Sequence, residues 1–233
     1  MKRLTWKHIV AINVALLVVI IGGFYIRKMV KESYLFDEHL KKGSSYMNQG
    51  KWGPASVEFA EASKIRPESY ETNYGYGAAL LKLRQLDTAV PALENAVRIN
   101  PEAVEAHYSL GIAYHRTQKY DLAMREYKEV LKINPQAFQA YSSIGSLYTL
   151  QGKYNEAMEA YSAAQEINPD YHLIYMNKGY LYEITGKPND AIKAYGELIN
   201  LSARGPVDEN ILKEAERRIE RIKKGKTLSL KKK

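Results

Sequence analysis

Histidine, cysteine, serine and paired carboxylates are the side chains that most often carry catalysis or bind metals, and their spacing here supports neither role. The five histidines are spread along the chain, and no two of them lie four residues apart. They are His8, His39, His107, His115 and His172. The chain has no cysteine, no G-x-S-x-G elbow and no glycine-rich phosphate loop. We therefore expect no catalytic residue, no metal site and no cofactor, and we predict that the protein is not an enzyme.

Charge is concentrated at the two ends of the chain. Residues 1–35 carry six basic and one acidic side chain, and residues 213–233 carry ten basic and three acidic ones. The overall net charge of +8 therefore belongs to the termini, because residues 36–212 carry 18 basic and 22 acidic side chains. A groove that follows nucleic-acid phosphates needs clustered basic side chains, so we do not expect the central region to bind nucleic acid.

Residues 9–26, IVAINVALLVVIIGGFYI, contain no charged side chain. As a helix this segment would be about 27 Å long, close to the ~30 Å hydrocarbon core of a bilayer. Trp6 precedes it, and Phe24 and Tyr25 lie near its end, where aromatic rings favour the water–lipid boundary. Bulky and basic residues follow in place of a small-residue cleavage site, which predicts an uncleaved signal anchor. The N-terminal part then divides into a basic tail (1–8), one transmembrane helix (9–26) and a juxtamembrane helix (27–35).

The sequence predicts the transmembrane segment more clearly than it predicts the orientation of the chain in the membrane. Three basic residues precede the apolar segment and five follow it before residue 43, which slightly favours a cytoplasmic C-terminus. A basic start followed by an apolar run instead resembles a secretory segment with its N-terminus inside. We expect a single-pass protein of a bacterial inner membrane. Because long domains translocate largely regardless of nearby charge, we expect the remainder of the chain on the extracytoplasmic, periplasmic side.

Several residue types recur at intervals of 34 along the rest of the chain. The glycine column comprises Gly43, Gly77, Gly111, Gly145 and Gly179, and the alanine column comprises Ala55, Ala89, Ala123, Ala157 and Ala191. A large-residue column comprises Phe59, Leu93, Tyr127, Tyr161 and Tyr195, and prolines close four units at Pro67, Pro101, Pro135 and Pro169. Small residues let two helix axes approach closely, and the large residue fills the adjacent gap. Because a glycine inside a helix costs about 0.5–1 kcal/mol relative to alanine, its recurrence predicts a packing requirement.

This pattern resembles the tetratricopeptide repeat (TPR), a helix–turn–helix unit of 34 residues. The resemblance covers residues 36–205, in units 36–69, 70–103, 104–137, 138–171 and 172–205. It implies an all-α fold, a TPR helix–turn–helix solenoid wound into a right-handed superhelix, here preceded by one transmembrane helix. His39 and His107 share one repeat position that usually holds a large aromatic residue, so we expect both to be half-buried packing residues.

Turn residues agree with five helical hairpins. Gly50, Gly152 and Gly186 stand between the paired helices, where glycine stops a helix. The residues expected as N-caps of the second helices are Asp87, Asp121, Asn155 and Asn189. Stacked repeats need caps at their ends, and residues 206–224 form an amphipathic segment suited to a C-terminal capping helix. We expect the basic residues 225–233 to be a disordered tail.

By resemblance, the concave face formed by the first helices of a TPR array binds an extended or helical peptide. The residues expected on this face are Tyr74, Leu81, Tyr108, Ile112, His115, Arg116, Ser142, Ser146, Thr149, Met176 and Tyr180. Aromatic side chains with an arginine and neighbouring hydroxyls are typical of protein interfaces. The alternative is that these are ordinary exposed tyrosines of a tyrosine-rich repeat. The paired Lys and Asn clamp of some family members is not supported, since Leu40, Ser44 and Ala78 occupy the matching positions.

The sequence thus predicts a non-catalytic, membrane-anchored TPR scaffold that binds a partner protein or peptide on its concave face and assembles a complex at the membrane. The alternative is docking through the basic tail to a polyanion, which could be anionic lipid, an envelope polymer or nucleic acid. Attraction of the tail to anionic lipid is compatible with either hypothesis. Self-association is a further partner alternative that the sequence leaves open.

Overall fold

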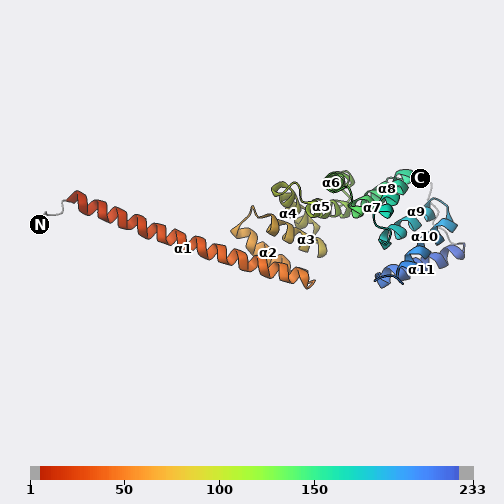
Figure 1. Ribbon diagram of the computed structural model, residues 1–233, viewed down its shortest axis with the longest axis horizontal. Coiled ribbons are helices and arrows are strands. Elements are labelled where there is room, and N and C mark those ends of the chain that lie inside the picture. The colour runs from red at the N-terminus through yellow and green to blue at the C-terminus, as the bar shows by residue number, and fades with distance from the viewer. Residues whose placement is uncertain (1–5, 226–233) are drawn as a thin grey trace. The chain divides into compact units, whose positions relative to one another are not determined.

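The computed structural model describes residues 6–225, with side chains at residues 6, 13, 14 and 16–225, and over this range its regular elements are all α-helices. The chain divides into two compact units, Met1–Pro101 and Glu102–Lys233 (Figure 1). The N-terminal unit contains α1 (Trp6–Asn48), α2 (Trp52–Ile65), α3 (Tyr70–Lys82) and α4 (Leu86–Ile99). The C-terminal unit contains α5 (Val104–Arg116), α6 (Tyr120–Ile133), α7 (Phe138–Leu150), α8 (Tyr154–Ile167), α9 (His172–Ile184), α10 (Pro188–Leu201) and α11 (Glu209–Lys223).

Consecutive helices pair as hairpins (Figure 1). The end of α1 pairs with α2, α3 with α4, α5 with α6, α7 with α8, and α9 with α10. Each pair falls within one of the five predicted 34-residue ranges, and α11 falls within residues 206–224. The residues before three of the closing prolines, Asn100, Asn134 and Asn168, are extended, because proline disfavours a helical conformation in the residue before it. The fold is therefore an all-helical solenoid of hairpins, as the periodic pattern predicts.

The small-residue columns lie where paired helices touch. A Cβ added at Gly111 would lie 2.5 Å from the ring of Tyr127, and one added at Gly145 would lie 2.6 Å from the ring of Tyr161. All five residues of the alanine column are fully buried. The large-residue column fills the space that the glycines leave, with 3% or less of each residue exposed. The predicted packing role of the columns is confirmed.

The turns inside the hairpins confirm the predicted glycine stops, and two further turns of the same kind are made without glycine. Gly50, Gly152 and Gly186 adopt positive φ angles of 69°, 74° and 74°, as expected of helix stops. Arg84 and Gln118 hold the same turn position with φ angles of 60° and 61°, although neither is glycine.

The predicted N-caps are each wrong by two residues. The second helices begin at Leu86, Tyr120, Tyr154 and Pro188, so the predicted caps lie inside the first turn. The observed caps are Gln85, Lys119, Lys153 and Lys187, and none of them makes a side-chain capping hydrogen bond. Asp87 and Asp121 instead place negative charge near the positive end of the helix dipole.

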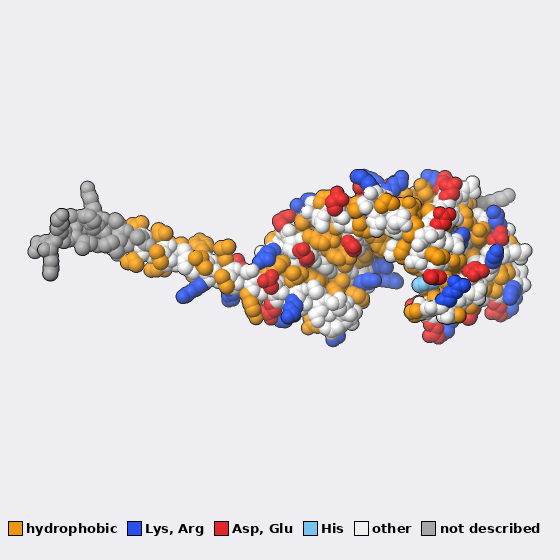
Figure 2. All heavy atoms as spheres, in the orientation of Figure 1, with side chains coloured by type: hydrophobic (Ala, Val, Ile, Leu, Met, Phe, Trp, Pro, Cys, Tyr) orange, Lys and Arg blue, Asp and Glu red, His pale blue; other side chains and the backbone are white. Residues whose placement is uncertain are grey.

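Helix α1 runs for 43 residues without interruption, so the predicted juxtamembrane segment and the first helix of the first repeat are one helix. Its early part extends beyond α2 (Figure 1) and carries exposed hydrophobic side chains (Figure 2). Helix α1 contacts the end of α2 through Arg66. Arg66 Nη2 donates a hydrogen bond to Ser33 Oγ (2.8 Å), and the Arg66 guanidinium lies 4.0 Å from the ring centre of Phe36.

Within the residues described, no helix contains an apolar window long enough to cross a bilayer. The transmembrane helix therefore remains a prediction.

The C-terminal end of the repeats is covered by α11, which packs on α10. The Asp208 carboxylate accepts a hydrogen bond from the Asn210 backbone N–H (2.8 Å) and caps the helix. Ala215 and Ile222 are buried against α10, and Ile211 and Ile219 are partly buried beside them. The predicted disordered tail lies outside the described residues, apart from Gly225.

Candidate peptide-binding face

The first helices α5, α7 and α9 lie beside one another on one face of the C-terminal unit. Tyr108 on α5 has its hydroxyl 3.4 Å from Ser143 Oγ on α7. On the next pair, Asn177 Nδ2 on α9 donates to Ser142 Oγ on α7 at the same distance. Side chains about one repeat apart therefore meet across adjacent first helices. We call the accessible side chains of these three helices the first-helix face.

Seven of the predicted site residues lie at least partly exposed on the first-helix face. They are Tyr108, Ile112, His115 and Arg116 on α5, Ser146 on α7, and Met176 and Tyr180 on α9. Tyr74 lies on α3 in the N-terminal unit, where its ring stacks on Tyr70 with 5.7 Å between ring centres. The set is therefore divided between the two units.

Three predicted site residues are buried and offer little surface to a partner. Leu81, Ser142 and Thr149 have exposures of 6%, 5% and 9%. Thr149 Oγ1 donates to the Gly145 carbonyl (2.9 Å) and lies 3.2 Å from the Tyr161 hydroxyl. These residues belong to the packing between helices, which the spacing of the first-helix positions did not reveal.

The burial of Thr149 has a counterpart in the neighbouring repeats. The residue twelve positions before each tyrosine of the large-residue column is polar: His115, Thr149 and Glu183 precede Tyr127, Tyr161 and Tyr195. Where the column holds Phe59 or Leu93, the matching residues are Met47 and Leu81. A buried phenol needs a hydrogen-bond partner and a phenyl ring or leucine does not, which accounts for Thr149 beside Tyr161 and for Glu183 beside Tyr195. Burial raises the pKa of Tyr161 to about 12, so its hydroxyl remains protonated.

Tyr108 is the central aromatic residue of the face. It is half-buried, and its ring centre lies 5.8 Å from that of Tyr127. Burial raises the pKa of the Tyr108 phenol, so the group remains a neutral donor and acceptor. A cavity of about 310 Å³ opens beside it, between α5, the end of α6 and the start of α7. An aromatic side chain at the edge of a cavity is the type of group that anchors a bound segment.

The face ends at Tyr180, near the capping helix. The guanidinium of Arg218 on α11 lies 5.3 Å from the Tyr180 ring centre, which is within range of a cation–π contact. Sequence reasoning missed Arg218 as a neighbour of this face. Because α11 lies outside the 34-residue register, no repeat position could have indicated that contact.

Glu183 is a buried charge that sequence reasoning did not single out. Its side chain is fully buried and accepts hydrogen bonds from Tyr195 (3.2 Å) and from Arg218 Nη1 (3.1 Å), and Arg221 Nη2 contacts its other oxygen. Both carboxylate oxygens are thus engaged. The arrangement ties α11 to the last repeat and leaves no free base for catalysis.

The two packing histidines each have a carboxylate partner. His39 Nδ1 lies 2.7 Å from Glu58, and His107 Nδ1 lies 2.7 Å from Glu126. Both pairs join the two helices of one hairpin, and both histidines are at least half-buried, as predicted. Among the described residues, no three His, Asp or Glu side chains come together in a way that could hold a metal ion.

Comparison with known proteins identifies the repeats. Three family models described as tetratricopeptide repeat match residues 77–138, 138–171 and 173–204. A crystal structure of MamA is 23% identical, with a TM-score of 0.61, over 70% of this chain and 95% of that one. MamA from Desulfovibrio magneticus RS-1 is 18% identical over 74% and 98% of the two chains, with a TM-score of 0.66. A thermophilic TPR protein of Thermus thermophilus is 20% identical over 79% and 98%, with a TM-score of 0.65. At these identities the likeness concerns the fold alone, and no curated protein sequence matches the chain.

Proposed function

Because the chain belongs to the tetratricopeptide repeat family, we propose that it is a non-catalytic scaffold that binds a segment of a partner protein on its first-helix face. The observation that carries this proposal is that Tyr108, Ile112 and Arg116 on α5 and Met176 and Tyr180 on α9 are all accessible. Tyrosine and arginine dominate the binding energy of many interfaces because each combines a large contact area with a polar group.

The proposal includes membrane attachment by residues 9–26. Support comes from the described part of this segment, where large hydrophobic side chains of α1 are exposed to an extent unusual for a soluble helix. These side chains are Val14, Leu16, Leu17, Val18, Val19, Ile20, Ile21, Phe24, Tyr25 and Ile26. We further propose that the anchor lies in a bacterial inner membrane, with the repeats on the extracytoplasmic side.

Membrane attachment and orientation can be tested in one set of experiments. The full chain should remain with membranes after alkaline carbonate extraction, and a variant lacking residues 1–28 should be released. Because the chain has no cysteine, Ser202→Cys introduces one exposed thiol for labelling. A membrane-impermeant maleimide should label this thiol in intact spheroplasts. Labelling only after lysis would place the repeats in the cytoplasm and reverse the proposed orientation.

Partner binding is tested by pull-down from detergent-solubilised membranes. Tyr108→Ala combined with Arg116→Ala should remove partners from the eluate while circular dichroism shows unchanged helicity. Each truncation of such a residue typically costs about 2 kcal/mol, or roughly thirtyfold in affinity. Arg125→Ala, an exposed arginine on the second helix α6, is the matched control and should retain the partners.

A deletion of residues 226–233 separates this proposal from docking through the basic tail. The deletion should leave partner capture intact if the first-helix face is the binding surface. If the double variant kept every partner and the tail deletion lost them, the first-helix face would be excluded. Docking of the tail to a polyanion would then replace it, and strong weakening by salt would support that outcome.

A further inference from the structure

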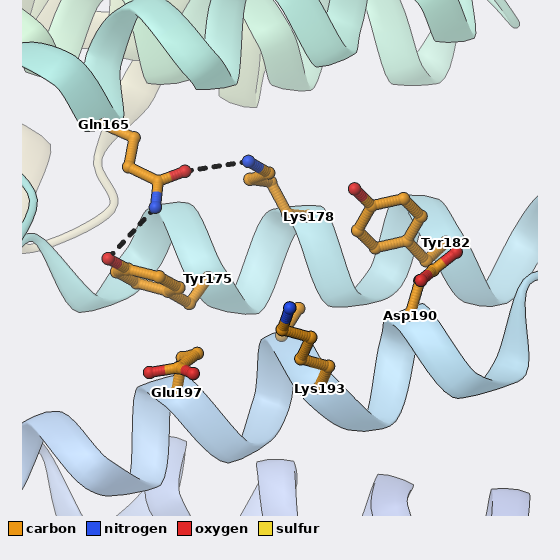
Figure 3. Close-up of a pocket in the computed structure, with 8 residues that line it drawn as sticks. Gln165, Tyr175, Lys178, Tyr182, Asp190, Lys193 and Glu197 are labelled. Carbon is orange, nitrogen blue, oxygen red and sulfur yellow. Dashed lines mark hydrogen bonds between the residues drawn. The ribbon is translucent and has the colours of Figure 1, made fainter.

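A cavity of about 260 Å³ opens between α8, α9 and α10 in the C-terminal unit (Figure 3). Its lining residues are Gln165, Tyr175, Lys178, Tyr182, Asp190, Lys193, Ala194 and Glu197. None of them is among the predicted site residues named on the first-helix face. We call this cavity the Lys178 pocket.

Lys178 occupies a position that is part of the apolar core in two other repeats and holds the half-buried Tyr76 in a third. One and two units earlier, the same position holds Ile144 and Leu110, which are 6% and 2% exposed. Lys178 is only half-buried, and a lysine there contributes less packing than an aliphatic residue of the core. Packing alone therefore does not explain the lysine.

The contrast with Lys42 shows what Lys178 lacks. Lys42 holds the same repeat position in the first unit, is exposed, and forms an ion pair with Glu38 (2.7 Å). Lys178 Nζ donates to the neutral oxygen Oε1 of Gln165 (2.8 Å). Among the side chains that the structure describes, no carboxylate forms an ion pair with Lys178.

The polar groups around Lys178 are held in place by one another. Gln165 Nε2 donates to the Tyr175 hydroxyl (3.2 Å), which donates in turn to the Pro169 carbonyl (2.7 Å). This chain of bonds fixes the Gln165 oxygen toward Lys178 (Figure 3). Burial lowers the pKa of the Lys178 ammonium, because the charged form is partly removed from water.

A second lysine reaches the same cavity from α10. Figure 3 shows the Lys193 side chain extending from α10 toward α9. The Tyr182 hydroxyl lies on the side of its ring that faces Lys178. Asp190 and Glu197 flank Lys193 on α10 and are exposed at the rim. In the described part of the chain, neither of them forms an ion pair with Lys178 or Lys193.

We propose that the Lys178 pocket binds a carboxylate group, held by Lys178 and Lys193 and by a hydrogen bond from the Tyr182 hydroxyl. An incoming carboxylate would provide the negative charge that Lys178 lacks, and charge-assisted hydrogen bonds of this type are stronger than neutral ones. Because Asp190 and Glu197 bring the formal charge of the lining to zero, a singly charged group suits the pocket better than a phosphate. The carboxylate can come from an acidic side chain of a partner protein or from a free small molecule.

The test uses the full chain in neutral detergent, with lysine labelled by ¹³C. The Lys178 side-chain signal is assigned by its loss in Lys178→Gln. Titration with N-acetylglutamate methylamide should shift the Lys178 and Lys193 signals saturably and should raise the pH at which Lys178 titrates. The neutral N-acetylglutamine methylamide should bind at least tenfold more weakly. Equal binding of the two compounds would overturn the proposal.

Lys178→Leu supplies the second test, because it restores the type of residue found at position 110. This variant should unfold at the same or a higher temperature, yet bind the glutamate probe at least tenfold more weakly, read from the Lys193 signal. Unchanged binding would overturn the proposal, and Lys178→Gln serves the same purpose if the leucine variant does not fold. An eight-residue peptide with blocked ends, whose one charged group is a central glutamate, identifies the source of the carboxylate. Binding tenfold tighter than the single residue indicates a protein segment, and equal binding indicates a free carboxylate.

Discussion

Glu183 is the contact that we expect to hold α11 on the last repeat. Its carboxylate is fully buried and is shared by Tyr195 and by Arg218 and Arg221 of α11. Replacing it with alanine would leave both arginines without their buried counter-charge. Because the units of a repeat protein contact only their neighbours, we expect Glu183→Ala to loosen α11 and to leave α3 unchanged.

The expected size of this effect follows from the exposure of the arginines. Removing one partner of a buried ion pair typically costs about 3–5 kcal/mol. The side chains of Arg218 and Arg221 are 21% and 33% exposed, so both can regain some hydration. Arg218 also keeps Glu214, 2.7 Å from its Nε. We therefore expect Glu183→Ala to destabilise the packing of α11 by about 3 kcal/mol, the lower end of this range.

Amide hydrogen exchange measures this loss locally. About 3 kcal/mol corresponds to a roughly hundredfold loss of protection for the α11 amides in Glu183→Ala. The matched control is Glu214→Ala, which removes a partly exposed carboxylate from the same arginine and should cost less than about 1 kcal/mol. If α11 kept its protection in Glu183→Ala, or if both variants lost the same amount, the argument from the buried charge would be refuted.

Three further predictions concern the helical packing, the turns and pH. Gly111→Ala should lower the free energy of unfolding by about 1–3 kcal/mol, because the new Cβ would meet a buried tyrosine ring. Gly196→Ala, which has open space, should raise it by about 0.5–1 kcal/mol, and thermal unfolding compares the two. Arg84→Gly and Gln118→Gly should each stabilise the protein in urea by up to about 1 kcal/mol, because glycine adopts their positive φ without strain. Burial lowers the pKa of His115 below 6.5, so the unfolded state takes up the proton first and stability should fall as pH drops through 6.5. The loss of melting temperature between pH 7.5 and 5.5 should be smaller in His115→Gln.

The sequence by itself determined the helical hairpins and their packing. The glycine and large-residue columns pair Gly111 with Tyr127 only 16 residues apart, and this local contact is repeated with a constant period. A contact that recurs in every unit requires the same type of residue at the same repeat position, and this recurrence can be seen in the sequence. The C-terminal capping helix was predictable for a similar reason, because its apolar residues follow the period of a single helix.

The tertiary structure alone decided which of the predicted site residues are accessible. Leu81, Ser142 and Thr149 hold first-helix positions that the sequence pattern placed on the binding face, yet contacts with neighbouring helices bury them. Likewise, Glu183 receives its partner Arg218 from 35 residues away, on a helix outside the repeat register. The physical reason is that residue spacing within a helix defines which side chains share a face. Only the packing of successive helices defines how much of that face remains in contact with solvent.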